Sequence, residues 1–133
     1  MIRYYFRKLR KNEHGAAMIE FAIIALLLFT LIFGIIEFGW VFFGWITLTG
    51  AVREGARLAI VGEDENAIRE AVIKHARGFE NLSVDIPPVM TQGTSTTISA
   101  EGDFPFLVGF FFNEGSFSLS AEASMRQELN KAN

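Results

Sequence analysis

The strongest pattern in the chain is one long apolar run near its N-terminus. From residue 21 to residue 36 every side chain is apolar or small except that of Thr30, and after Glu37 the apolar character resumes. Together with residues 16–19, the first run has about 20 residues. At about 1.5 Å per residue, a helix of that length spans the ~30 Å hydrocarbon layer of a membrane. The pattern therefore predicts a single transmembrane helix.

A secretory signal and a buried core helix both fit the run less well. A cleavable secretory signal has a shorter apolar core followed by a small-x-small site, whereas this run is longer and is followed by Glu37-Phe38-Gly39-Trp40. A buried helix that is apolar on all faces needs surroundings that the roughly 80 remaining residues cannot provide.

The positions after the first helix predict a small α+β domain. Gly62 is expected to end that helix as a C-cap. Residues 63–66 are expected to begin a second helix, because their acidic side chains match the positive end of its dipole. Apolar positions three or four residues apart predict this helix at 66–79, and alternating positions predict strands at 82–86, 96–100 and 117–126. We expect one helix packed on an antiparallel sheet of about three strands.

The segment from Phe104 to Phe112 differs from its surroundings because it carries five phenylalanines in nine residues. Its pattern predicts a short loop that cannot span a membrane. Such a loop can be core, can dip into the membrane or another interface, or can bind a partner.

The basic residues are concentrated before the apolar run. Residues 1–14 hold five basic residues and one acid, whereas the rest of the chain has 7 basic and 14 acidic residues. Because Lys and Arg beside a membrane helix stay in the cytoplasm, we expect the N-terminus inside and the C-terminal domain outside. Nucleic acid is not an expected partner, since the overall net charge is −3 and the remainder is acidic.

Two carboxylates interrupt the apolar helix. Glu20 lies inside the run, where an unpaired carboxylate is costly, so it must snorkel, be protonated or meet a cation. A cut just before Ala16 would create such a cation, the new α-amine. Glu37 lies 17 residues after Glu20, about 25 Å along a helix, which predicts a headgroup-level carboxylate at the outer interface.

A third group of charges, Arg53, Glu54 and Arg57, follows on the same helix. Arg53 and Arg57 share a face, and Glu54 can pair with Arg57 three residues later. The group is either a solvated helix end or a docking face for a partner's carboxylates, such as Glu37 of a neighbouring copy, because Arg binds carboxylates bidentately.

Catalytic and metal-binding chemistry have no support in the residues. There is no cysteine, no Ser/His/acid set and no phosphate-binding loop. The two histidines, His14 and His75, are expected on opposite sides of the membrane. We therefore expect no enzyme activity, no cofactor and no metal.

The start of the helix resembles a type IV prepilin cleavage signal. Gly15-Ala16-Ala17-Met18-Ile19-Glu20 follows a basic leader and opens an apolar helix. In that family a membrane aspartyl peptidase cuts after the glycine, and a glutamate is the fifth residue of the mature chain. The resemblance implies cleavage after Gly15, with Glu20 of one subunit neutralising the terminal amine of a neighbour, since a buried charge is tolerated when paired.

The resemblance narrows to TadE-like proteins, the minor pilins or pseudopilins of the tight-adherence (Flp-type) pilus machinery. It rests on AAMIEFAIIALLLFTLIFGIIEFG at 16–39 and AVREGARLAIVG at 51–62, and Ala123-Ser124-Met125-Arg126 also fits. It implies a role in assembly or priming of an adhesion pilus. The implied partners are a prepilin peptidase, other pilin and minor pilin subunits, the inner-membrane assembly platform and membrane lipid.

This interpretation divides the chain into a leader (1–15), a transmembrane and stem helix (16–62) and a small domain outside the cytoplasm (63–133). It places the protein in the bacterial inner membrane as a single-pass subunit with a periplasmic C-terminal domain. A pseudopilin of a secretion system fits less well, because the Arg53–Arg57 segment matches the TadE-like pattern. An unprocessed single-pass anchor that presents a binding module to a periplasmic partner is the alternative from a different class.

Overall fold

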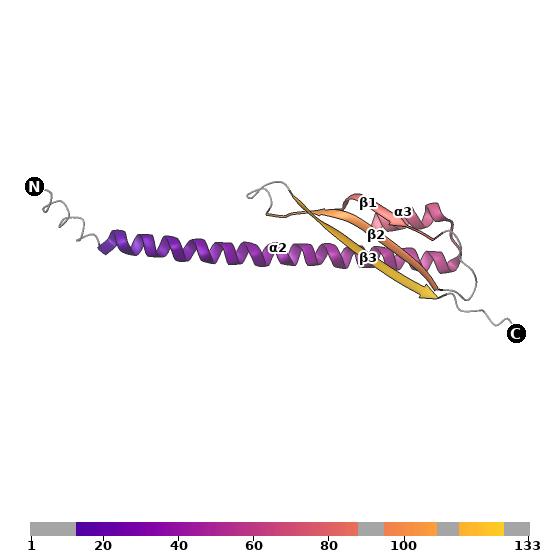
Figure 1. Ribbon diagram of the computed structural model, residues 1–133, viewed down its shortest axis with the longest axis horizontal. Coiled ribbons are helices and arrows are strands. Elements are labelled where there is room, and N and C mark those ends of the chain that lie inside the picture. The colour runs from indigo at the N-terminus through magenta and orange to yellow at the C-terminus, as the bar shows by residue number, and fades with distance from the viewer. Residues whose placement is uncertain (1–12, 88–94, 109–114, 127–133) are drawn as a thin grey trace, which may run out of the picture. The chain divides into compact units, whose positions relative to one another are not determined.

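The computed structural model describes residues 13–87, 95–108 and 115–126, which form two helices and three strands (Figure 1). Helix α2 spans Glu13–Val61 and helix α3 spans Glu65–His75. The strands are β1 (Glu80–Asp85), β2 (Ser95–Pro105) and β3 (Ser116–Arg126). The predicted α+β fold is confirmed: a long apolar N-terminal helix precedes a small domain with one further helix and a three-stranded antiparallel sheet.

The end of α2 has the geometry that the sequence predicts. Gly62 adopts a φ of 89°, a left-handed conformation that glycine reaches without a steric penalty. Its N–H donates to the carbonyl of Ala59, and the N–H of Glu63 donates to the carbonyl of Leu58, both at 3.2 Å. These two bonds form a Schellman motif, which ends the helix and satisfies two of its last carbonyls.

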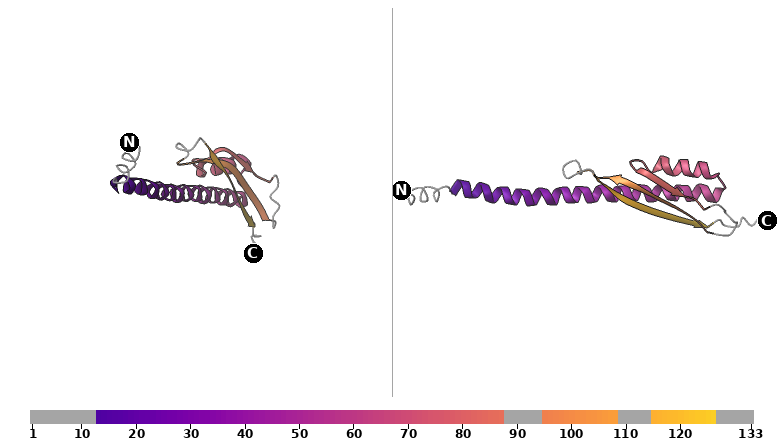
Figure 2. Two further views of the ribbon diagram at one scale, coloured as in Figure 1. Left: turned by 60° about the vertical axis from the view of Figure 1, so that its left-hand side comes forward. Right: turned by 45° about the horizontal axis from the view of Figure 1, so that its top comes forward.

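The sheet has the strand order β1-β2-β3, with both pairs antiparallel. Figure 2 shows β2 and β3 running side by side along most of their length. In β2 alternate side chains are buried, and their neighbours on the other face are mostly polar and exposed. β2 continues to Pro105, five residues beyond its predicted end, because Phe104 keeps the alternation beyond Glu101 and Asp103. The expectation that Phe104 belongs to a loop is therefore wrong, since it lies in the strand.

The contacts within the chain define two compact units, divided between Ile36 and Glu37. The second unit contains the rest of α2 together with α3 and the sheet. Its core draws on all of these elements, so the sheet packs on α2 as well as on the predicted second helix. The fully buried side chains of this core include Leu48, Val52, Ile68, Val72 and Ile98.

Helices α2 and α3 approach closely at Gly55. A Cβ on this residue would lie 2.6 Å from Cγ2 of Val72, far inside van der Waals contact. Small neighbours continue this inward-facing side of α2, with Ala51, Ala56 and Ala59 fully or almost fully buried. Small side chains on one helix thus make room for the branched side chains of the other.

Candidate functional site

The first unit presents an apolar helix surface with no core of its own. From Ala16 to Ile36 the side chains of α2 are exposed, apart from a half-buried Ala25. This is the one helix among the described residues that is long and apolar enough to cross a membrane. The hydroxyl of Thr30 donates to the carbonyl of Leu26 at 2.8 Å, so the helix itself satisfies this polar group. Such a surface fits a single-pass membrane anchor.

Glu20 is exposed on this apolar surface. No ion pair or hydrogen bond involves its carboxylate within the described part of the chain. Gly15 and Ala16 lie in the first turns of α2, one helical turn before Glu20. A carboxylate in this position requires a cation or a proton from elsewhere if the helix is to lie in lipid.

The environment of Glu37 differs from that of Glu20. Glu37 binds the turn region that follows β2. Its Oε1 accepts the backbone N–H of Leu107 at 3.0 Å, and its Oε2 accepts that of Val108 at 2.8 Å. Hydrogen bonds to an ionised acceptor are stronger than neutral ones. The carboxylate that the sequence predicted at a membrane interface therefore makes a bidentate contact within its own chain.

Trp40, one helical turn after Glu37, also contacts the end of β2. Its indole N–H donates to the carbonyl of Pro105 at 2.9 Å. Its ring lies 5.2 Å from that of Phe104, which in turn lies 4.9 Å from the ring of Phe79. Phe104 is 1% exposed, and a Cβ on Gly44 would lie 2.7 Å from its ring. This aromatic cluster and the Glu37 carboxylate together fix the end of β2 against α2.

The segment Arg53–Arg57 presents its charged side chains outward and its small residues inward. Arg57 donates to both carboxylate oxygens of Glu54, at 2.9 and 2.6 Å. The hydrogen bonds from Arg57 lower the pKa of the Glu54 carboxyl from its ordinary value. Arg53 is exposed and makes no ion pair within the described ranges. Its guanidinium is thus available to a carboxylate of another molecule, whereas that of Arg57 is already shared.

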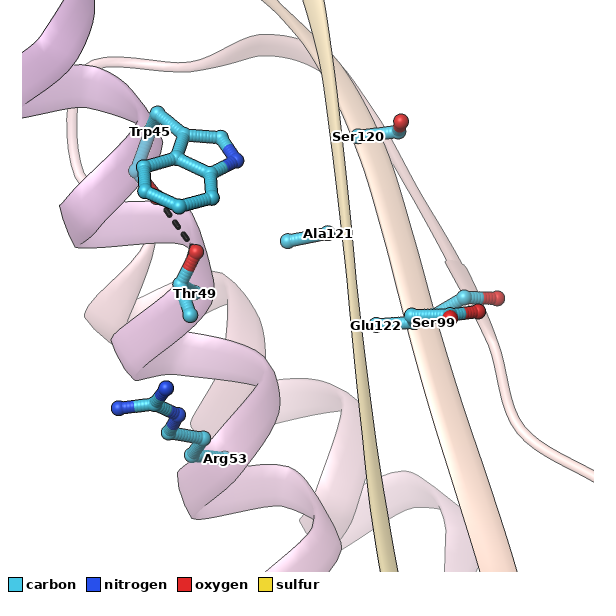
Figure 3. A pocket seen from close by; sticks show the side chains of 7 residues that line it. All are labelled: Trp45, Thr49, Arg53, Ser99, Ser120, Ala121 and Glu122. Atoms are coloured by element: carbon cyan, nitrogen blue, oxygen red, sulfur yellow. Dashed lines mark hydrogen bonds between the residues drawn. The ribbon is translucent and has the colours of Figure 1, made fainter.

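An open groove of about 530 Å³ lies between this side of α2 and the sheet. Figure 3 shows Trp45, Thr49 and Arg53 along the helix, with Ala121 of β3 turned toward them. Thr49 uses its hydroxyl within the helix, donating to the carbonyl of Trp45 at 2.8 Å. The helix side of the groove carries an aromatic ring and a guanidinium, while Ser99, Ser120 and Glu122 border it with side chains that point away from the helix in Figure 3. No group of His, Asp or Glu that could hold a metal occurs among the described residues.

The second unit brings together some of the predicted site residues and keeps others apart. It pairs Glu54 with Arg57 and leaves Arg53 beside the groove, while the Glu37 carboxylate is occupied by the backbone of residues 107 and 108. Sequence reasoning did not identify Trp40 or Gly55 as structural residues. An indole N–H in an apolar helix was a usable signal, because a buried indole normally finds an acceptor.

Comparison with known proteins agrees with the chemistry of this helix. The family model of TadE-like proteins matches residues 15–57. This segment is TadE-like. The match begins at the glycine before the apolar run and ends at Arg57, which pairs with Glu54. The TadE-like family is associated with pili and is typically non-enzymatic. Searches of curated proteins and of solved structures returned no match.

Proposed function

We propose that this chain is a minor pilin or pseudopilin that acts in the assembly or priming of a Tad/Flp-type pilus, and thereby in surface attachment. The observation that carries the proposal is the order of features in the TadE-like segment. A glycine at residue 15 is followed five residues later by a lone carboxylate on an otherwise apolar, exposed helix.

Cleavage after Gly15 by a prepilin peptidase gives Glu20 the cation that its position requires. The new α-amine of Ala16 lies one helical turn from the Glu20 carboxylate of its own chain. In a neighbouring subunit, the α-amine can lie at the same depth in the membrane as this carboxylate. Pairing between neighbours removes two isolated charges from an apolar environment, which favours lateral assembly of these helices.

Further contacts between subunits are assigned to the charged residues beyond the apolar run. The unshared guanidinium of Arg53 supports a role in binding a carboxylate of a neighbour, with Arg57 and Glu54 as a preformed pair beside it. Glu37 acts indirectly, by fixing the end of β2 against α2. The expected neighbours are other pilin and minor pilin subunits and the inner-membrane assembly platform.

The proposed location is the inner membrane, with residues 1–15 as a cytoplasmic leader, residues 16–62 as membrane and stem helix, and residues 63–133 in the periplasm. The alternative is an unprocessed anchor that presents its domain to a periplasmic partner. Under that alternative, Gly15 and Glu20 can be replaced without consequence.

The deciding experiment is intact mass and N-terminal sequencing of the membrane-extracted protein, produced with and without its prepilin peptidase. We expect a chain that starts at Ala16 only when the peptidase is present. Gly15→Lys should abolish the cut, while Gly50→Lys should not, because Gly50 is an exposed position with open space around it. A chain that still starts at Met1 beside an active peptidase would contradict the proposal.

A further inference from the structure

The turn region after β2 is attached to α2 at the point where the apolar run ends. Ile36 is the last residue of the first unit, and Glu37 is covalently joined to it. Because Glu37 accepts the N–H groups of Leu107 and Val108 at 3.0 and 2.8 Å, these residues lie within a few ångströms of that point. The turn region after β2 is thus held at residue 37, the first residue of the second unit.

Among the described residues at this end of the hairpin, two large apolar side chains are exposed. Leu107 is 50% exposed and Phe117 is 42% exposed. The ring of Phe117 packs edge-on against that of Phe106, with the centroids 4.5 Å apart. We call these three residues, Phe106, Leu107 and Phe117, the hairpin tip. The tip presents an aromatic pair and a leucine whose exposed surfaces no other described residue of the second unit covers.

The backbone donors of the tip are satisfied internally, which is what entry into a membrane interface requires. Phe106 donates its N–H to the carbonyl of Gly115 at 3.1 Å. Leu107 and Val108 donate theirs to Glu37, and the carbonyl of Pro105 accepts the indole N–H of Trp40. The tip can therefore lose water without leaving these groups unpaired.

We propose that the hairpin tip rests in the lipid headgroup region of the outer leaflet, as a second membrane contact beside the emerging helix. This inference rests on the proposed membrane anchoring of α2. Two observations favour lipid over a protein partner: covalent proximity to the apolar run, and phenylalanine and leucine side chains of the kind that interfacial segments bury at the headgroup boundary. The internally paired backbone donors permit the contact. The contact holds the domain close to the bilayer.

The absence of native cysteine allows a direct test, because a single introduced cysteine can carry an environment-sensitive fluorophore. The full chain is reconstituted alone, at a low protein-to-lipid ratio, in phosphatidylcholine vesicles that contain spin-labelled quencher lipids. The tip is probed with Leu107→Cys. Leu27→Cys reports on the apolar run, where that side chain is 72% exposed, and Thr97→Cys reports on the exposed polar face of β2.

We expect the Leu107→Cys probe to be blue-shifted and to lose most of its fluorescence with quenchers placed near the headgroup. The Leu27→Cys probe should be quenched best by labels deep in the acyl chains, and the Thr97→Cys probe by neither. Adding Glu37→Ala to the Leu107→Cys protein should reduce the quenching, because the carboxylate no longer holds the tip beside the helix.

The possible failures are distinguishable. If the Leu27→Cys probe is not quenched, the proposed membrane anchoring itself is wrong. If it is quenched while the Leu107→Cys probe behaves like the Thr97→Cys probe, anchoring stands and the tip contact is overturned. A blue shift at residue 107 without quenching means that protein covers the tip, as in self-association, and also overturns it. Equal quenching at residues 107 and 97 overturns a contact specific to the tip.

Discussion

The carboxylate of Glu37 accepts the backbone N–H of Val108 at 2.8 Å, across 71 residues of sequence. Through this hydrogen bond and the one from the N–H of Leu107, a carboxylate on an apolar helix attaches the sheet to that helix. The same carboxylate is suited to the end of a membrane span, because its acceptor oxygens are engaged by donors of its own chain.

Replacing Glu37 should loosen the end of β2 without unfolding the domain. Glu37→Gln keeps one acceptor oxygen and removes the charge, so we expect a loss of about 1–3 kcal/mol in the free energy of unfolding. Hydrogen exchange at the amides of Leu107 and Val108 should accelerate in the detergent-solubilised protein. Amides in the centre of the β2–β3 pair, such as that of Ile98, serve as the internal control. Unchanged protection at residues 107 and 108 would show that the carboxylate does not hold them.

The close approach of the two helices makes Gly55 sensitive to even the smallest side chain. Gly55→Ala places a Cβ against Val72, and we expect a destabilisation of about 1–3 kcal/mol from overpacking. The matched control is Gly50→Ala, where nothing lies within 4 Å. That change should stabilise by about 0.5–1 kcal/mol, because alanine is the better helix former. Denaturant midpoints of the two variants should therefore move in opposite directions. Equal shifts would rule out tight packing at Gly55.

Phe104 should be a dominant core residue of the domain. It is 1% exposed and its ring packs against those of Trp40 and Phe79, so Phe104→Ala should cost about 3–5 kcal/mol of stability. Phe117→Ala removes the same ring from a half-exposed position and should cost much less. Chemical unfolding followed by tryptophan fluorescence measures both. A similar cost for the two variants would contradict the placement of Phe104 in the core.

Arg53 should matter for association and not for folding. Because it is exposed and makes no ion pair in the described chain, Arg53→Gln should leave the unfolding midpoint unchanged. Co-purification with the other pilus subunits should decrease. Arg69→Gln is the opposite control, since Arg69 donates to the carbonyl of Val84 at 2.8 Å and also pairs with Glu65. That change should lower stability. Undiminished co-purification of Arg53→Gln would remove Arg53 from the assembly surface.

Local sequence patterns were sufficient to predict the helices and strands themselves. The C-cap at Gly62, the helix before β1 and all three strands follow from periodicity and turn chemistry that neighbouring residues carry. The helix Glu65–His75 ends earlier than its apolar stripe suggested, because Ala76 and Phe79 reach the core from the connection after it. Tertiary packing continues the stripe after the helix has ended.

The role of α2 in the domain core could not be predicted from local patterns. Its second half is apolar on several faces, so no stripe marks the side that packs against α3 and the sheet. Gly55 acquires a role only when Val72 is brought against it, and the alanines at positions 51, 56 and 59 only when the domain core buries them. Nor did the pattern place Phe104 in a strand, since Gly102 occupies a buried position just before it and has no apolar side chain to mark the alternation.

The sequence by itself determined the apolar run, the glycine and carboxylate at its start, and the α+β character of the C-terminal domain. Each of these is a property of residues close together in the chain. Only the tertiary structure decided that Glu37 binds the backbone at 107 and 108 and that Val72 packs against Gly55. Both contacts depend on the meeting of segments far apart in the sequence, which no local pattern encodes, whereas the Glu54–Arg57 pair follows from the spacing of the two residues on one helix.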